Sequence, residues 1–153
     1  MQKTQCDITQ GSGYSMVHLE NFSQLEDYPF HHEATGIKTD AKLFLSKILS
    51  CTGCIISATS LAPHTSMPFH HKHQRNEELY LFTRGQGEFQ IDEAIFPIAE
   101  GTAIRVAPQA VRCWRNISDE PLCYFVIQAP EGVFDGEQTI EDGLLVPKAV
   151  EWT

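Results

Sequence analysis

Hydrophobic and polar positions alternate in short runs along most of this chain. From about residue 43 onward, runs rich in Val, Ile, Phe, Tyr and Thr are separated by Gly, Pro and acidic residues. Such runs are typical of β-strands joined by tight turns, and the period of an amphipathic helix is nearly absent. The pattern predicts strands at residues 43–49, 54–62, 67–73, 78–84, 88–92, 94–98, 102–107, 111–117 and 122–129.

The regular spacing of these strands predicts the organisation of the domain. Turn-forming residues separate neighbouring runs, as in Gly85-Gln86-Gly87, and their dihedral preferences suit tight connections. Many short strands at even spacing favour one antiparallel barrel or sandwich. We therefore expect a single all-β domain over residues 1–153, with its barrel core at about 54–129.

The two ends of the chain differ from this core. An N-terminal extension, about residues 1–42, is more polar, and a short helix is predicted around Asn21 to Tyr28. A C-terminal tail, about residues 130–153, alternates an acidic loop with an apolar Gly-Leu-Leu-Val-Pro run. We expect both to pack onto the barrel or to be exchanged with a partner subunit. Because terminal strands often cover barrel edges by pairing two subunits, a homodimer is expected.

Composition and charge exclude several classes of partner. With 153 residues, of which 42% are hydrophobic, the chain can bury one well-packed core. Its net charge of −9 and its scattered Lys and Arg residues would repel a phosphate backbone, so no nucleic-acid partner is expected. No apolar run approaches the ~20 residues of a membrane helix, and the first residues do not resemble a signal peptide. We expect no membrane association and a cytoplasmic location.

Two histidines and a glutamate have the spacing of a metal site. His71 and His73 are two residues apart, so on a strand both imidazoles point to the same face. A polar turn follows, and the next strand brings Glu78 onto one face together with Tyr80. Two imidazoles and one carboxylate form a facial ligand set that leaves coordination positions open. This set predicts a divalent metal, and Fe, Mn, Ni, Co and Zn all suit it.

The same residues resemble the cupin superfamily. Its first motif reads G-x5-H-x-H-x3,4-E-x6-G, and the matching residues are His71, His73, Glu78 and Gly85. The opening Gly of that motif is absent from this chain. Its second motif reads G-x5-P-x-G-x2-H-x3-N, and the residues that resemble it are Gly101, Pro108 and Asn116. The resemblance covers roughly residues 54 to 129 and implies a cupin barrel, also called a double-stranded β-helix or jelly roll.

The second motif departs from the family at its metal ligand. Arg112 stands four residues before Asn116, where the family has a histidine. A guanidinium stays charged and cannot ligate a cation, so two arrangements are open. In one, three protein ligands hold the metal while Arg112 binds the carboxylate or phosphate of an acidic small molecule. In the other, Arg112 pairs with Glu78 and the metal is absent or weakly held.

Three further residues are candidates for contact with a small molecule. Asn116 and Trp114 share one face of the predicted strand 111–117 with Arg112, and Tyr80 shares a face with Glu78. Tyr80 and Trp114 suit either a substrate cavity or the barrel core. Together with Arg112, these residues form the predicted substrate-binding set.

Two classes of function fit these residues. The resemblance implies a metal-dependent enzyme, of the dioxygenase, isomerase or epimerase class, that acts on a small anionic molecule. The alternative is a non-catalytic binding or sensing cupin in which Arg112 replaces the fourth metal ligand, because this fold does not determine function. A cavity beside His71 and Glu78 is required by the first hypothesis.

Overall fold

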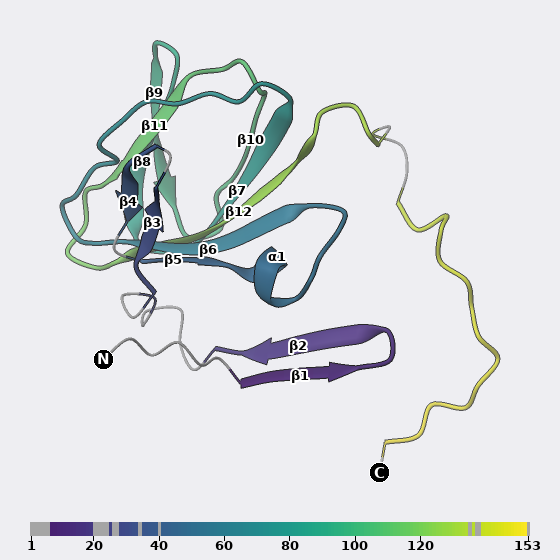
Figure 1. Ribbon diagram of the computed structural model, residues 1–153. Coiled ribbons are helices and arrows are strands. Elements are labelled where there is room, and N and C mark those ends of the chain that lie inside the picture. Colours follow the sequence, from purple (N-terminus) through teal and green to yellow (C-terminus); the bar gives the residue numbers. More distant parts are fainter. Residues whose placement is uncertain are drawn as a thin grey trace.

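The computed structural model describes residues 7–19, 25, 28–33, 35–39, 41–134, 136 and 139–152, and regular structure in these residues is almost entirely β (Figure 1). The helix predicted around Asn21 to Tyr28 lies largely outside the described residues. None of the described helices is long and apolar enough to cross a membrane.

Short strands and the single-turn helix α1 follow one another along the described chain. They are β1 (Asp7–Gly11), β2 (Tyr14–His18), β3 (Phe30–His32), β4 (Ile37–Thr39), β5 (Lys42–Phe44), α1 (Leu45–Ile48), β6 (Ile55–Leu61), β7 (Asn76–Arg84), β8 (Gln86–Ile91), β9 (Ala94–Ala99), β10 (Ala103–Val106), β11 (Arg112–Asn116) and β12 (Leu122–Pro130).

Two antiparallel sheets build the core of the domain. The larger sheet has the strand order β10-β7-β12-β6-β5, and the smaller has the order β11-β8-β9. Inward-facing residues alternate along each strand, as a period of two requires, and they meet in one apolar cluster. Its buried members are Tyr80, Phe82, Val106, Leu122, Tyr124 and Val126 from the larger sheet, and Phe89, Ile98 and Trp114 from the smaller. The all-β prediction is thereby confirmed.

Two of the predicted strands differ from the structure. The run 43–49 forms only the end of β5 and then the single turn α1, because Leu45 packs against the small cluster around Leu25 and Ala58 instead of extending the strand. Short apolar runs of this kind fit a strand or a helical turn equally well.

Segment 67–73 is not a continuous strand. Within it only His71 forms a β-bridge, and its partner is Arg112. Pro68 lacks the N–H that a regular ladder requires.

The N-terminal extension forms two hairpins that the sequence pattern did not predict. Strand β1 pairs with β2, and β3 pairs with β4. The β3–β4 hairpin lies beside the barrel (Figure 1) and contributes side chains to its cavity. By contrast, every described residue from 139 to 152 is exposed, and this tail runs away from the barrel as the yellow segment of Figure 1. The expectation that the tail packs onto its own barrel is not met.

Candidate metal centre and ligand cavity

Backbone hydrogen bonds hold the two histidines against the smaller sheet. The His71 N–H donates to the Arg112 carbonyl (3.1 Å), and the Arg112 N–H donates back to the His71 carbonyl (3.0 Å). The His73 N–H donates to the Pro108 carbonyl (2.8 Å). These bonds keep the backbone extended near both histidines, so their side chains point to the same side although no regular strand forms.

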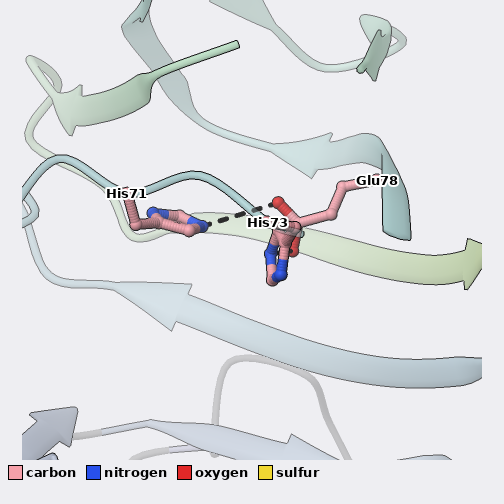
Figure 2. A group of neighbouring side chains, drawn as sticks. All are labelled: His71, His73 and Glu78. Atoms are coloured by element: carbon pink, nitrogen blue, oxygen red, sulfur yellow. Dashed lines mark ion pairs between the residues drawn. The ribbon is translucent and has the colours of Figure 1, made fainter. Parts of the chain in front are cut away.

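The three predicted ligands come together at one point of the barrel interior. Candidate ligand atoms of His71, His73 and Glu78 all lie within 4.8 Å of one another. His73 Nε2 is 3.0 Å from Glu78 Oε1, and His71 Nε2 is 3.5 Å from Glu78 Oε2. Figure 2 shows the imidazoles and the carboxylate converging from separate parts of the backbone.

The donor atoms of this cluster fit a divalent transition metal. His73 Nε2 lies 3.0 Å from Glu78 Oε1 but forms no hydrogen bond with it, so like His71 Nδ1 it is buried without a hydrogen-bond partner among the described residues. A buried polar atom without a partner is costly, and a metal ion would satisfy an imidazole nitrogen such as His73 Nε2. Two neutral imidazoles and a carboxylate suit Fe, Mn, Co, Ni or Zn.

The second carboxylate oxygen is held by two other side chains. Glu78 Oε2 accepts hydrogen bonds from Tyr80 Oη (2.5 Å) and from Arg112 Nε (3.0 Å) and Nη2 (2.8 Å). These donors fix the orientation of the carboxylate and leave Oε1 on the side of His73, as partners of a metal-ligating group commonly do.

Electrostatics keep the Glu78 carboxyl ionised. Burial alone would raise its pKa, but the neighbouring His71, His73, Tyr80 and Arg112 side chains outweigh burial and hold the pKa well below its ordinary value. Because a carboxyl group must lose its proton to ligate a cation, the site needs no further deprotonation of Glu78 at neutral pH.

Arg112 is fully buried, and its guanidinium is bonded to other groups of the protein. Besides Glu78, Arg112 Nη1 donates to the carbonyls of Pro108 (3.2 Å) and Ala110 (2.8 Å), and the side chain has 0% exposure. Of the two arrangements open from the sequence, the structure shows the pairing of Arg112 with Glu78. Direct contact between Arg112 and an anionic ligand stays a prediction, and it would require this ion pair to rearrange.

A cavity of about 710 Å³ opens beside the three candidate ligands. Tyr80 and Trp114 both line it and also belong to the core cluster, and their contact with a ligand stays a prediction. Most of the remaining wall is apolar and includes Phe30, Phe44, Phe69 and Val126. A space of this size and character suits a small organic molecule.

Asn116 is placed away from this cavity. Its side-chain N–H groups donate to the carbonyls of Leu61 (3.0 Å), Ala62 (3.1 Å) and Glu120 (2.7 Å), and its Oδ1 accepts from Ser118. Asn116 therefore fastens two loops together, and the described lining of the cavity does not include it. Its contact with a ligand stays a prediction, and it would have to be made outside the described lining of this cavity.

Sequence reasoning missed several contributors to the cavity, and two of them come from the N-terminal part of the chain. Lys42 on β5 and the β3–β4 hairpin both line it. The only signal in the sequence was the i, i+2 pair of Lys42 and Phe44, which places both side chains on one face of a strand. Without a known pairing partner, that face could not be assigned to the interior.

Comparisons with known proteins agree with this geometry. A family model described as a cupin domain matches residues 58–128. A crystal structure of a cupin protein from Bacteroides fragilis is 32% identical, covers 72% of this chain and 92% of its own, and superposes with a TM-score of 0.65. The chain belongs to the cupin superfamily.

More distant cupins share the fold alone. A Cupin 2 conserved barrel domain protein from Salinispora arenicola is 20% identical, covers 60% of this cupin and 76% of its own chain, and has a TM-score of 0.53. The cupin domain of Cnp3 from Schizosaccharomyces pombe is 14% identical, with coverages of 60% and 63% and a TM-score of 0.51. A search of curated proteins found no match.

Proposed function

We propose that this cupin is a metal-dependent enzyme that acts on a small anionic molecule, with a divalent metal held by His71, His73 and Glu78. The observation that carries this proposal is the convergence of the three side chains beside a cavity of about 710 Å³. Three protein ligands leave positions open for a substrate or water. When bound, the metal would supply Lewis-acid or redox chemistry, as in dioxygenases, isomerases or epimerases.

The residues of the chain itself have separable tasks in this proposal. Tyr80 and Arg112 orient the Glu78 carboxylate through Oε2, and the aromatic wall of the cavity excludes water from the ligand. Because the Arg112 guanidinium balances the Glu78 carboxylate, the two charges of the cation are left without compensation. An anionic ligand would supply that compensation in a low-dielectric interior.

One observation favours a second candidate, a binding or sensing cupin without turnover. The Glu78 carboxylate already has a buried guanidinium partner, so the barrel needs no cation to compensate that charge. In this alternative the cavity binds a small molecule and the histidines contribute hydrogen bonds.

Metal content distinguishes the two candidates. We would measure metals by elemental analysis in protein purified without a His tag, for the wild type, the His71→Ala/His73→Ala variant and the control His70→Ala. His70 neighbours the ligands, but it is exposed and bonded to Gln90. Near-stoichiometric metal in the wild type and control, lost in the double variant, supports the metal centre. Absence of metal from the wild type, after purification in metal-supplemented medium, would favour the binding module.

Turnover needs its own measurement once the metal is known. The metal-loaded protein would be incubated with a panel of small organic acids, and each mixture followed by mass spectrometry. Products that appear with the wild type and not with the His71→Ala/His73→Ala variant support an enzyme. Acids recovered unchanged after tight binding support the sensing alternative.

A homodimer and a cytoplasmic location also stay proposals. The exposed apolar side chains of the tail, including Leu144, Leu145 and Trp152, support exchange with a second subunit. A monomer mass in light scattering would argue against the dimer. The described cysteines are all free thiols, which suits a reducing compartment.

A further inference from the structure

Lys42 is a cation on the cavity wall, and no carboxylate in the described part of the chain pairs with it. Its side chain lines the cavity beside the candidate metal ligands, yet Lys42 makes no ion pair with any described carboxylate. The ammonium group instead lies 5.2 Å from the centre of the Phe44 ring. Lysine is rarely buried unless paired, so a half-buried, unpaired Lys42 calls for an explanation by function.

The strand register directs Lys42 into the barrel. Lys42 lies opposite Thr59 on β6, Thr59 lies opposite Tyr124 on β12, and Tyr124 lies opposite Phe82 on β7. Directly opposite residues of neighbouring strands share a face. Because Tyr124 and Phe82 are buried in the core, Lys42 belongs to the same inward-facing row.

Two threonine hydroxyls that share a cavity wall with Lys42 also have no hydrogen-bond partner among the described residues. Thr39 Oγ1 and Thr59 Oγ1 are buried without a hydrogen bond to any described residue. Thr59 is only 5% exposed. Thr39 and Lys42 line both the main cavity and a side cavity of about 300 Å³, and Thr59 lines the side cavity. All three groups, one of them cationic, line the side cavity with unused hydrogen-bonding capacity, and Thr39 and Lys42 also face the main cavity.

We propose that Lys42, with Thr39 and Thr59, forms the anion-binding end of the ligand cavity and receives the carboxylate of a small molecule with an apolar body. This inference rests on the proposed function, because it names the ligand class for the same cavity. A carboxylate accepts charge-assisted hydrogen bonds from an ammonium group and from hydroxyls. The apolar body packs against Phe30 and Phe44, and its far end lies toward His71 and Glu78.

With Lys42 as the anion-binding group, the ligand does not need to contact Arg112. The guanidinium is already bonded to Glu78 and to two backbone carbonyls, whereas the Lys42 ammonium group forms no ion pair with any described carboxylate. Burial lowers the pKa of Lys42, and the Glu78 carboxylate opposes that effect. A bound carboxylate would favour the charged amine further, so ligand and lysine stabilise each other.

Binding of phenylacetate, compared with its neutral analogue phenylacetamide, tests the proposal. Fluorescence of Trp114, which lines the cavity, reports binding once the exposed Trp152 is replaced by Phe. In that background we would compare the parent protein, Lys42→Met and the control Lys148→Met. Lys148 is an exposed lysine of the C-terminal tail, away from the described lining of the cavity. Each protein is titrated both with chelator and after metal loading, with its metal content measured.

The expected result is at least ten-fold tighter binding of phenylacetate than of phenylacetamide by the parent. Lys42→Met should weaken phenylacetate binding at least ten-fold, with Lys148→Met unchanged. Undiminished binding by Lys42→Met, an equal loss in Lys148→Met, or no phenylacetate binding by the parent at millimolar concentration overturns the proposal. Because metal content is measured in the same samples, a protein that loads no metal but keeps Lys42-dependent binding shows that only the metal proposal has failed.

Discussion

Removing the Arg112 side chain should destabilise the metal-free protein far more than removing the side chain of Arg115, which lies on the same strand, β11. The Arg112–Glu78 pair has side-chain exposures of 0% and 3%. Substitution Arg112→Met keeps most of the side-chain volume but leaves an ionised carboxylate without its cationic partner. Loss of one member of a buried pair typically costs about 3–5 kcal/mol of unfolding free energy. That is a large share of the roughly 5–15 kcal/mol that stabilises a typical domain.

The structure supplies the reasons for expecting the full cost. Arg112 donates two hydrogen bonds to Glu78 Oε2 and two to backbone carbonyls, and methionine can replace none of them. Hydrogen bonds to charged groups contribute about 1.5–3 kcal/mol each in net terms. Tyr80 still donates to Oε2, so part of the compensation for the carboxylate survives. The lost Arg112 hydrogen bonds and the remaining Tyr80 bond together keep the expected loss of unfolding free energy at about 3–5 kcal/mol, the range for a broken buried pair.

Arg115 provides the matched control on β11. It pairs with Glu88, but these side chains are 59% and 32% exposed, so Arg115→Met should cost at most about 1 kcal/mol. Urea unfolding would be followed in the presence of chelator for the wild type and both variants, with free energies taken from linear extrapolation. A third variant, Glu78→Gln/Arg112→Met, should recover part of the loss because the uncompensated charge is gone. If the two arginine variants differ by less than about 1 kcal/mol, Arg112 is not the buried partner of Glu78.

Two further predictions concern the metal centre. Tyr80→Phe should weaken metal binding about ten-fold because it removes one of the donors that orient Glu78. The control Tyr124→Phe removes a hydroxyl that accepts from Trp114 Nε1 and should leave the metal affinity unchanged. Competition with a chromophoric chelator measures both affinities, and equal values for the two variants would contradict the orienting role. Arg112→His should bind metal at least ten-fold more tightly than the wild type. The substitution removes a cation from the site and offers the nitrogen ligand that the cupin motif has at this position. The same competition assay measures the affinity, and an unchanged or weaker value would count against repulsion of the metal by Arg112.

The barrel strands could be predicted because their side chains alternate between core and solvent. Strand β7, for example, buries Glu78, Tyr80 and Phe82 while the residues between them are less buried. That period of two is visible in the sequence alone. The N-terminal hairpins carry a weaker signal, since all residues of β1 are exposed and those of β2 alternate only between exposed and half-buried. Strands β3 and β4 have three residues each, which is too short for a clear pattern. Position relative to the barrel, not local pattern, determines their contribution to the cavity.

The partners of Arg112 were left open by the sequence for a different reason. Spacing places Arg112 on the inner face, but it does not say whether the guanidinium meets Glu78 or faces the cavity. That choice depends on the path of the loop before β11, because the carbonyls of Pro108 and Ala110 accept from Nη1. Lys42 was missed because its inward direction follows only from pairing with β6, a contact 17 residues away in the sequence.

The two histidine ligands illustrate how little regular structure a site requires. The predicted strand 67–73 does not form, yet His71 and His73 still point toward Glu78, because backbone bonds to Arg112 and Pro108 hold the chain extended at these positions. The same His71–Arg112 bridge fixes both a candidate metal ligand and the cation that neutralises Glu78. A shift of this bridge would move both groups together. Substitutions at position 112 therefore act on the ligand geometry as well as on the charge, and measurement of stability and metal affinity on the same variants separates the two effects.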